Sequence, residues 1–477
     1  MKILLVYPNA ERELIGYMDL GAIAEPIALE YVAAAGRRLG HDVRLLDLRL
    51  HVHDLDSTLL DYQPDVVGVT GYSMHVLRNL EVCARAKTLV PECKTVVGGH
   101  HVTLEPVDYF EPQMDFLVIG EGIIAFQAIL NRLQGGEPVA GIPGVWSRVD
   151  GSFRFGGPSP HFDIDSLPVP DRSLVPTDRS EYHIDDMKPV ALARTTVGCP
   201  YRCSFCSLWR IMDGHYYKRD LDDVAREFAA IPERYIHLSD DEPFVNQRRM
   251  MQLADRLEAH GVDKNYYAYC RIDTFLKNRE LMRRWRDLGL NRLFFGVETI
   301  FDHELAQYNK RQKRDQIVEA LALARQLDIR IFANFIIHPS YTEKEFDEVK
   351  RFIREQEVEY PSFTIWTPIP GIEDGGTNYD QVLELQDNGR PDWSQFDLQH
   401  AVIKTARPKH EFFALYGSLY EVSPHGKPTL AAQNEAPMAK ERQYRWQEFK
   451  DMDEQKREAA HIALALKLLG GGIPPSA

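Results

Sequence analysis

Three cysteines lie close together in the segment GCPYRCSFCS. Cys199, Cys203 and Cys206 have the spacing Cys-x3-Cys-x2-Cys, and three thiolates on one short loop can bind three irons of a 4Fe-4S cube. The fourth iron is then left without a protein ligand and can be chelated by a small molecule. Structural zinc, the alternative, prefers four ligands, commonly as paired Cys-x2-Cys or with histidine, and no second pair lies nearby. The spacing therefore favours an iron-sulfur cluster with one open iron.

Acidic side chains follow two predicted strands further along the chain. Asp240 and Asp241 stand in the segment SDDEPF, and Glu298 stands in GVET. Carboxylates at strand ends can accept hydrogen bonds from the ammonium or hydroxyl groups of a ligand, although an acidic cluster there can also cap a helix. We interpret all three as candidate cofactor-binding residues.

The elements that must position these residues form a βα series. Strands are predicted over 190–195, 235–238, 266–270, 292–296, 330–337 and 362–367, with helices such as 221–230 and 279–288 between them. Six βα units indicate an incomplete TIM-type barrel, a partial (β/α)6 fold over residues 189–372. The chemistry of such barrels lies at the carboxyl ends of the strands, and the cysteine loop follows the first of them.

The first 145 residues alternate short β-branched runs with helical patterns. This alternation is typical of a doubly wound, Rossmann-like α/β domain with a parallel sheet. Strands are predicted over 2–7, 42–47, 66–70, 94–97 and 116–119, and helices over 26–39 and 76–89. Ligands of such sheets bind outside the carboxyl ends of the strands. The residues at those ends are Pro8-Asn9, Gly71-Tyr72-Ser73, Gly98-Gly99-His100-His101 and Gly120-Glu121-Gly122.

Two further regions complete the predicted organisation. Residues 146–188 are interpreted as a linker, because the segment from 151 onward is rich in Pro, Gly, Ser and Asp. Residues 373–477 are interpreted as a mostly helical C-terminal domain with a charged helix over 441–468.

Composition limits the partners and the compartment. The 477 residues include 56 Lys and Arg against 71 Asp and Glu, a formal charge of −15, with no basic run that would neutralise phosphates. Nucleic acid is therefore not an expected partner. No stretch of 18 apolar residues occurs, and the N-terminal apolar run is too short for a secretory signal. Because the six cysteines are too few for a disulfide framework, we expect a cytoplasmic protein without a transmembrane segment.

The predicted barrel resembles the radical S-adenosylmethionine superfamily. Phe205, the aromatic residue before the last cysteine, matches the position that packs near the adenine in that family. The segment around Asp240 and Asp241 is similar to the acidic motif that receives the amino group of S-adenosylmethionine, and GVET is similar to the Gly-x-Glu-Ser element. After the fifth strand the chain departs from the family, since Gly-x-Pro-Gly-Glu-Thr is replaced by HPSYTE, whereas PIPG after the sixth strand follows the pattern.

The N-terminal domain resembles the cobalamin-binding domains that precede this barrel in class B radical methyltransferases. The resemblance implies that the corrin tail is held at three strand ends, by Ser73, Gly98, Gly99, Thr103, Gly120 and Glu121. Glycines let the backbone approach a bulky tail closely, and hydroxyls can bond its phosphate or ribose. The alternatives are a flavodoxin-like domain without a ligand and a methylthiotransferase, but the second cluster of that class needs three cysteines here and only Cys83 and Cys93 are present.

The Asp-x-His-x-x-Gly signature that supplies an axial histidine to cobalt is missing from this domain. We therefore expect cobalt to have no histidine ligand from the first βα loop. His75, His100 and His101 are the imidazoles available elsewhere at the strand ends.

The resemblance implies three cofactors, namely a 4Fe-4S cluster, S-adenosylmethionine and cobalamin. It implies that reductive cleavage of S-adenosylmethionine yields a 5'-deoxyadenosyl radical, that this radical abstracts hydrogen from an unactivated carbon, and that the carbon takes a methyl group from methylcobalamin. The substrate would be a lipid, a tetrapyrrole or a natural-product intermediate, and an external donor such as flavodoxin or ferredoxin would supply electrons. The alternatives are a cobalamin-dependent cyclase or ring-remodelling enzyme without methyl transfer, and a non-catalytic metal-binding interaction module.

Overall fold

The N-terminal sheet has seven strands in the order β3-β1-β4-β5-β6-β7-β8, and its first five strands are parallel. The parallel strands are β1 (Lys2–Tyr7), β3 (Asp42–Asp47), β4 (Val66–Val69), β5 (Lys94–Val97) and β6 (Phe116–Val118). Their apolar runs are nearly continuous because helices cover both faces of the sheet. Helices α1 (Ile27–Arg38) and α5 (Gly122–Gly135) pack on one face, and α2 (Leu55–Tyr62) and α3 (Val76–Leu89) on the other. The predicted doubly wound domain is confirmed.

Residues 145–155 form a hairpin at the edge of this sheet rather than the start of a linker. Strands β7 (Val145–Val149) and β8 (Ser152–Phe155) pair antiparallel, and β7 pairs with β6. Asp150 and Gly151 join the two strands with φ of 50° and 80°, as a type I' turn requires. The predicted linker over 146–188 is therefore wrong at its start. An Asp-Gly pair between alternating segments signals a hairpin, and the Pro- and Gly-rich sequence that follows obscured it.

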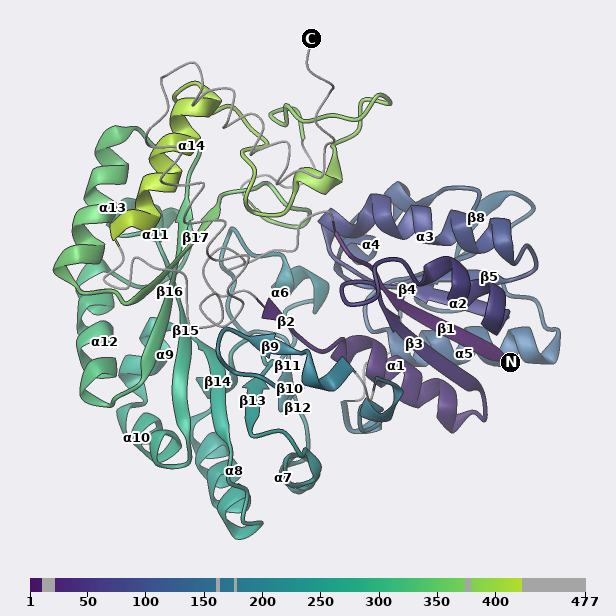
Figure 1. Cartoon of the computed structure of the whole chain (residues 1–477), viewed down its shortest axis with the longest axis horizontal. Helices are drawn as coiled ribbons and strands as arrows, with labels where there is room; N and C mark the ends of the chain where they lie inside the picture. The colour runs from purple at the N-terminus through teal and green to yellow at the C-terminus, as the bar shows by residue number, and fades with distance from the viewer. Residues whose placement is uncertain (11–21, 160–163, 176–177, 374–378, 423–477) are drawn as a thin grey trace.

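The second sheet has six parallel strands in the order β10-β13-β14-β15-β16-β17, which confirms the partial barrel. The strands are β10 (Val190–Ala193), β13 (Tyr235–Leu238), β14 (Asn265–Cys270), β15 (Leu290–Glu298), β16 (Arg330–Ile337) and β17 (Tyr360–Ile365). The helices between them are α7 (Leu221–Ala230), α8 (Gln247–Ala259), α9 (Ile272–Lys277), α10 (Arg279–Asp287), α11 (Asp302–Gln307), α12 (Arg314–Gln326) and α13 (Glu343–Glu355). Figure 1 shows these helices on the outer side of the barrel and the N-terminal domain, in purple and blue, beside it.

Our computed structural model describes residues 1–10, 22–159, 164–175, 178–373 and 379–422. Within the described part of the C-terminal region, α14 (Lys409–Ser418) is the only α-helix, and residues 379–408 form loops with isolated bridges and one 3-10 turn. The expectation of a mostly helical region is wrong for these residues, because breakers such as the segment DNGRPD interrupt any helix. The charged helix predicted over 441–468 lies outside the described residues.

Two segments tie the N-terminal domain to the barrel. Trp393, in the segment after the barrel, is 1% exposed, and its ring centroid lies 4.6 Å from that of His101. Glu25, which precedes α1, accepts hydrogen bonds from the backbone N–H of Leu192 in β10 and from Arg179 at 2.7 Å. A buried carboxylate with several charge-assisted donors holds its partners in one geometry. The two domains are thus held together both at β10 and through the segment after the barrel.

None of the described helices has both the length and the apolar character needed to span a bilayer.

Candidate functional site

The cysteine loop follows β11 (Thr196–Val197), directly after the first barrel strand. Gly198 opens the loop with φ of 90°, and a Cβ there would collide with the carbonyl oxygen of His215. Ser204 is anchored inside the loop, since its N–H donates to the Tyr308 carbonyl at 3.1 Å and its hydroxyl to the Gln307 carbonyl at 3.0 Å. These contacts present the three cysteine side chains from one short, fixed segment.

The thiols themselves lie in a poorly solvated environment. Burial raises the pKa of both Cys199 and Cys206 to about 12, so the free thiols are protonated at neutral pH. Iron binds thiolates, so assembly of a cluster here must release these protons. The three-thiol donor set fits a 4Fe-4S cluster with an open iron, as the sequence predicts.

Arg271 is a site residue that the sequence analysis did not single out. It follows β14, and its Nη1 donates to Cys203 Sγ at 3.3 Å. Its guanidinium stacks 3.9 Å from the ring centroid of Tyr201, and its Nε donates to Asp273 at 2.9 Å. The only signal in the sequence was its place at the carboxyl end of a barrel strand. Hydrogen bonds to cluster sulfurs raise reduction potentials, so Arg271 is placed to tune the cluster.

We expect Arg271→Met to leave the cluster in place but to move its midpoint potential to a more negative value by on the order of 50 mV. The reduced cluster carries one more negative charge and gains more from a cationic donor, worth about 1.5 kcal/mol. Redox titration followed by electron paramagnetic resonance measures the shift. Asp273→Asn is the matched control, because it keeps the donor to Cys203; an equal shift in both variants would contradict the assignment.

The two aspartates after β13 hold the cysteine loop. Asp240 is 1% exposed and accepts hydrogen bonds from the N–H and hydroxyl of Thr195, at 3.0 and 2.7 Å, and from the Thr196 hydroxyl. Asp241 accepts from the N–H of Gly198 at 2.9 Å. Both carboxylates therefore have partners within the protein, and Asp240 has several. Their geometry favours positioning of the loop over direct contact with a ligand.

Glu242, the next residue, has a carboxyl oxygen that is available to a ligand, which is what the sequence predicted for the two aspartates. It is 1% exposed, and its Oε2 accepts a hydrogen bond from the Arg271 N–H at 2.8 Å. Its Oε1 has no hydrogen-bond partner among the described residues. Burial raises the pKa of this carboxyl to about 8. A neighbouring ammonium group, such as that of S-adenosylmethionine, would favour the ionised form of this carboxyl and would give Oε1 a hydrogen-bond donor.

Glu298 ends β15 with φ of 62° and forms a buried ion pair beside the cluster loop. Lys310 Nζ donates to its Oε1 at 2.6 Å and lies 5.6 Å from the ring centroid of Phe205. Burial opposes the charged form of Lys310, but the negative charge of Glu298 raises its pKa overall. Phe205 also packs edge-on against Tyr308. The structure thus brings Glu298 and Phe205 together, with a lysine between them that the sequence analysis did not find.

The three strand ends of the N-terminal sheet also meet at one edge. Thr103 donates its hydroxyl hydrogen to the Gly99 carbonyl at 2.8 Å and accepts from the Gly120 N–H at 3.0 Å. Glu121 caps α5 through the Ile123 N–H at 3.1 Å. We call the surface formed by the strand ends at 98–99 and 120–121 and by Thr103 the cradle. Thr103 and Glu121 help to form it, and both already have hydrogen-bond partners there.

The two adjacent glycines of this edge have different roles. Gly99 has φ of 111°, and a Cβ there would lie 2.8 Å from the Gly71 carbonyl oxygen and 2.9 Å from Thr70 Oγ1. At Gly98 an added Cβ would meet only Val118, at 4.0 Å. The backbone geometry of the protein itself requires Gly99, whereas the space beside Gly98 is open to a ligand. An open cradle of this kind fits the tail of a corrinoid.

Two of the three histidines of this edge, His75 and His101, are hydrogen-bonded through their rings, and His100 differs from them. His75 Nδ1 accepts from the Tyr72 N–H at 3.0 Å. His101 is bonded through Nδ1 to Ser73 Oγ at 2.9 Å and through Nε2 to Asp108 at 3.0 Å. The His100 ring packs edge-on against Tyr72, at 4.8 Å between centroids, and has no hydrogen bond to any of the described residues. The rings of His75 and His101 are thus hydrogen-bonded to other residues of the protein.

The cradle and the cysteine loop adjoin each other. Helix α4 (His100–Leu104) follows Gly99, and α6 (Leu208–Ile211) follows the last cysteine, and the two helices are in contact. Gly371, in the PIPG segment, has φ of 86°, and a Cβ on it would lie 3.0 Å from Leu104 and 3.2 Å from Ser207. Glycine is needed where three segments come this close. The openings of both domains therefore share one region.

Charges from both domains also reach this region. Burial raises the pKa of Glu121 in the N-terminal domain and of Asp241 in the barrel, and the positive charge of Arg194 opposes both shifts. Arg194 directly follows β10, and its charge acts on carboxyls of both domains. Carboxylates and cations at facing strand ends are suited to a ligand that bridges two domains.

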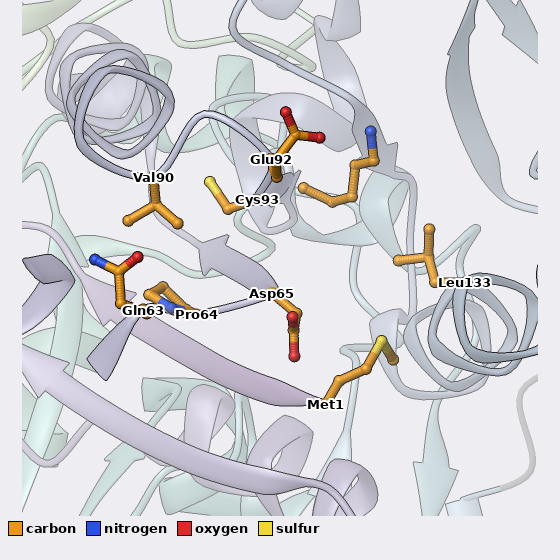
Figure 2. Close-up of a pocket in the computed structure, with 9 residues that line it drawn as sticks. Met1, Gln63, Pro64, Asp65, Val90, Glu92, Cys93 and Leu133 are labelled. Atoms are coloured by element: carbon orange, nitrogen blue, oxygen red, sulfur yellow. The ribbon is translucent and has the colours of Figure 1, made fainter. Parts of the chain in front are cut away.

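A separate surface cavity of about 340 Å³ lies at the opposite edge of the N-terminal sheet (Figure 2). Met1, Asp65 and Cys93, which line it, directly precede strands β1, β4 and β5. Ligands of parallel sheets bind at the carboxyl ends, so this cavity is not part of the site.

Comparison with known proteins decides the family. The family model of the radical SAM superfamily matches residues 194–353, and that of the B12 binding domain matches residues 17–130. The hopanoid C-3 methylase of Methylococcus capsulatus is 32% identical over 420 residues, which cover 87% of this chain and 78% of that protein. The chain belongs to the cobalamin-dependent radical S-adenosylmethionine enzymes. Its cofactors are accordingly a 4Fe-4S cluster, S-adenosylmethionine and cobalamin.

Other relatives show how broad this enzyme family is. The anaerobic magnesium-protoporphyrin IX monomethyl ester cyclase of Cereibacter sphaeroides is 25% identical, covering 78% of this chain and 62% of that protein. The methyltransferase TsrM from Kitasatospora setae, solved with cobalamin and a 4Fe-4S cluster, shares the fold with a TM-score of 0.62 at 20% identity, covering 78% of this chain and 77% of that one. The relatives place this enzyme among the methyltransferases of the family, and nothing in them supports a non-catalytic module.

Proposed function

We propose that this enzyme methylates an unactivated carbon of a small, mostly apolar molecule with fused or linked rings, which binds inside the barrel. The observation that carries the proposal is the inner face of the strands. Ile236 and Leu238 of β13 pack outward against the helices, so the alternate residue, His237, faces the barrel interior. Tyr267 and Tyr269 of β14 and Phe294 of β15 continue this face by the same alternation.

Four neighbouring rings line one part of this interior. The His237 ring lies 4.7 Å from Tyr267 and 5.1 Å from Tyr269 between centroids, and Tyr269 lies 5.3 Å from Phe294. Tyr269 is 38% exposed although its neighbours are mostly buried. Rings of this kind favour flat or polycyclic apolar ligands, which they contact over a large area.

Three buried polar groups in the same interior have an atom without a partner among the described residues. The atoms are Nδ1 and Nε2 of His237, Oδ1 of Asn334 and Oγ of Ser362. These residues are 5%, 8% and 1% exposed, and unpaired polar atoms at that burial cost free energy unless a ligand or water satisfies them. Burial lowers the pKa of His237 to about 3, so the ring is neutral and can both donate and accept. The expected substrate thus carries a hydroxyl, carbonyl or carboxyl group on an apolar body.

The relatives named above support this class of substrate. One is named for a hopanoid and another for a magnesium porphyrin ester, and both names denote large ring systems. The cobalamin supplies the methyl group and the cluster with S-adenosylmethionine supplies the radical chemistry when they are bound. The protein's part is to seat the substrate between them, with Glu242 and Glu298 at the S-adenosylmethionine side and the Gly98 cradle at the corrinoid side. An external one-electron donor completes the proposed system.

The direct test is incubation of the reconstituted enzyme with a hopanoid and with a porphyrin ester, followed by mass spectrometry. A product heavier than the substrate by one methylene supports methyl transfer. Ring closure, favoured by the cyclase relative, would instead leave the carbon count unchanged. Products from neither substrate, while a small aliphatic or amino acid substrate is methylated, would contradict the proposed class.

We expect His237→Phe to weaken substrate binding about fivefold to tenfold, as loss of a hydrogen bond worth about 1 kcal/mol predicts. Formation of 5'-deoxyadenosine without substrate should not change, because His237 lies on the substrate side. Isothermal titration with the substrate and a 5'-deoxyadenosine assay measure the two effects. Ile236→Val is the control on the same strand, since its side chain faces the helices; equal weakening there would point to a disturbed strand.

A further inference from the structure

A shallow hollow of about 300 Å³ lies on the outside of the cysteine loop and α6. Its lining residues are Arg202, Trp209, Arg210, Asp213 and Gly214. Arg202 directly precedes Cys203, and the other four residues lie in α6 and the turn after it, a few residues beyond Cys206, so the hollow adjoins the cysteine loop in the chain. The mechanism described above does not use this surface.

The hollow is built around a tryptophan between two arginines. The guanidinium carbons of Arg202 and Arg210 lie 5.5 and 4.9 Å from the ring centroid of Trp209. Both arginines are exposed, and Trp209 Nε1 is buried without a partner among the described residues. Tryptophan and arginine are the residues enriched in the centres of protein interfaces.

The charges of this surface differ from those of the chain as a whole. The chain carries a formal charge of −15, and several of its exposed arginines are paired with acids, as Arg85 is with Asp56 and Arg226 with Asp223. Arg202 and Arg210 instead lie over the Trp209 ring, and neither is in an ion pair with any residue in the described ranges. Asp213, also in the lining, offsets one of the two charges. The hollow is therefore a positive spot on an acidic protein.

The hollow is rigidly attached to the cluster loop. The carbonyl of Arg202 accepts a hydrogen bond from Asn309 at 2.7 Å, and the Gly214 N–H donates to the Trp209 carbonyl at 2.6 Å. Arg202 immediately precedes Cys203, whose sulfur bonds to Arg271. A protein seated here would therefore approach the cluster without any movement of the barrel.

We propose that this hollow is the docking surface for an acidic protein that donates one electron to the cluster; this rests on the proposed function, which requires such a donor. The step oxidises the donor by one electron and reduces the cluster by the same electron, with no bond made or broken and no proton moved. Positive charge on the acceptor steers an acidic donor and fixes its orientation. Trp209 supplies the apolar contact at the centre.

The test compares the charge-reversal double variant R202E/R210E with the unaltered holoenzyme. The donor is an acidic flavodoxin, and dithionite serves as a small chemical reductant. We expect flavodoxin binding, measured by isothermal titration, to weaken more than tenfold, and bleaching of the cluster by reduced flavodoxin to slow correspondingly. Raising the salt concentration should weaken binding in the unaltered enzyme and have little effect in the variant. Reduction and 5'-deoxyadenosine formation with dithionite should be unchanged.

R248E/R283E is the matched control, because both residues are exposed arginines on barrel helices away from the hollow. Unchanged flavodoxin binding in R202E/R210E, or equal weakening in the control, would overturn the proposal. If R202E/R210E does not retain the cluster, the neutral variant R202Q/R210Q replaces it, with the same comparison. Product formation with dithionite tests the proposed function separately, since its failure in the unaltered enzyme does not depend on docking.

Discussion

Replacing any one of Cys199, Cys203 and Cys206 by alanine should abolish the 4Fe-4S cluster and all formation of 5'-deoxyadenosine. Each thiolate holds one iron, and the fourth iron must stay open for S-adenosylmethionine, so no other ligand of the loop can substitute. We expect loss of the visible absorbance of the cluster after anaerobic reconstitution and activity at the background level. Ultraviolet-visible spectra, iron content and a 5'-deoxyadenosine assay measure these outcomes.

Cys83→Ala and Cys270→Ala are the controls, and both should keep cluster and activity. Cys83 is fully buried in α3 and Cys270 is 2% exposed at the end of β14, where both pack in hydrophobic cores. Cys270 is the stricter control because Arg271 follows it and bonds to Cys203. Loss of the cluster in Cys270→Ala with a folded barrel would show that the set of ligands is wrongly assigned.

Replacing Gly98 by leucine should abolish retention of corrinoid while leaving the iron-sulfur spectrum intact. An added Cβ at this position meets only Val118, at 4.0 Å, so the backbone tolerates a Cβ here, and we expect the rest of the leucine to take up space that the corrinoid needs. Purification after expression with ample cobalamin, followed by corrinoid absorbance and iron content, measures the result. We expect methyl transfer to fall to background because the cobalamin is absent.

Gly99→Leu serves as the contrasting variant. Its Cβ would collide with the carbonyl oxygen of Gly71 and with Thr70 Oγ1, and its φ of 111° strains any side chain. We expect this variant to lower the melting temperature of the N-terminal domain as well as corrinoid content, whereas Gly98→Leu should lower only the second. Full corrinoid content in Gly98→Leu would show that the corrinoid does not approach this strand end.

The sequence by itself determined the order of the elements and the chemistry of the cysteine loop. Hydrophobic periodicity and turn residues are local, and they predicted strands such as Lys2–Tyr7 and Arg330–Ile337 with their observed ends. The Cys-x3-Cys-x2-Cys spacing is also local, since three ligands on one loop need no distant partner. Local patterns did not predict the structure of residues 146–155. The high Pro, Gly, Ser and Asp content from residue 151 onward suggested a linker, but these residues form a hairpin.

Only the tertiary structure decided which acidic and basic side chains are bonded within the protein. Asp240, Asp241 and Glu242 are adjacent in the sequence, yet Asp240 is hydrogen-bonded to Thr195 and Thr196, while one oxygen of Glu242 has no partner in the part of the chain that the structure describes. Arg271 reaches Cys203 across 68 residues. Contacts of this kind depend on the register of strands and on which side chains exclude water. Those properties arise from packing between distant segments, which residue spacing in one chain does not encode.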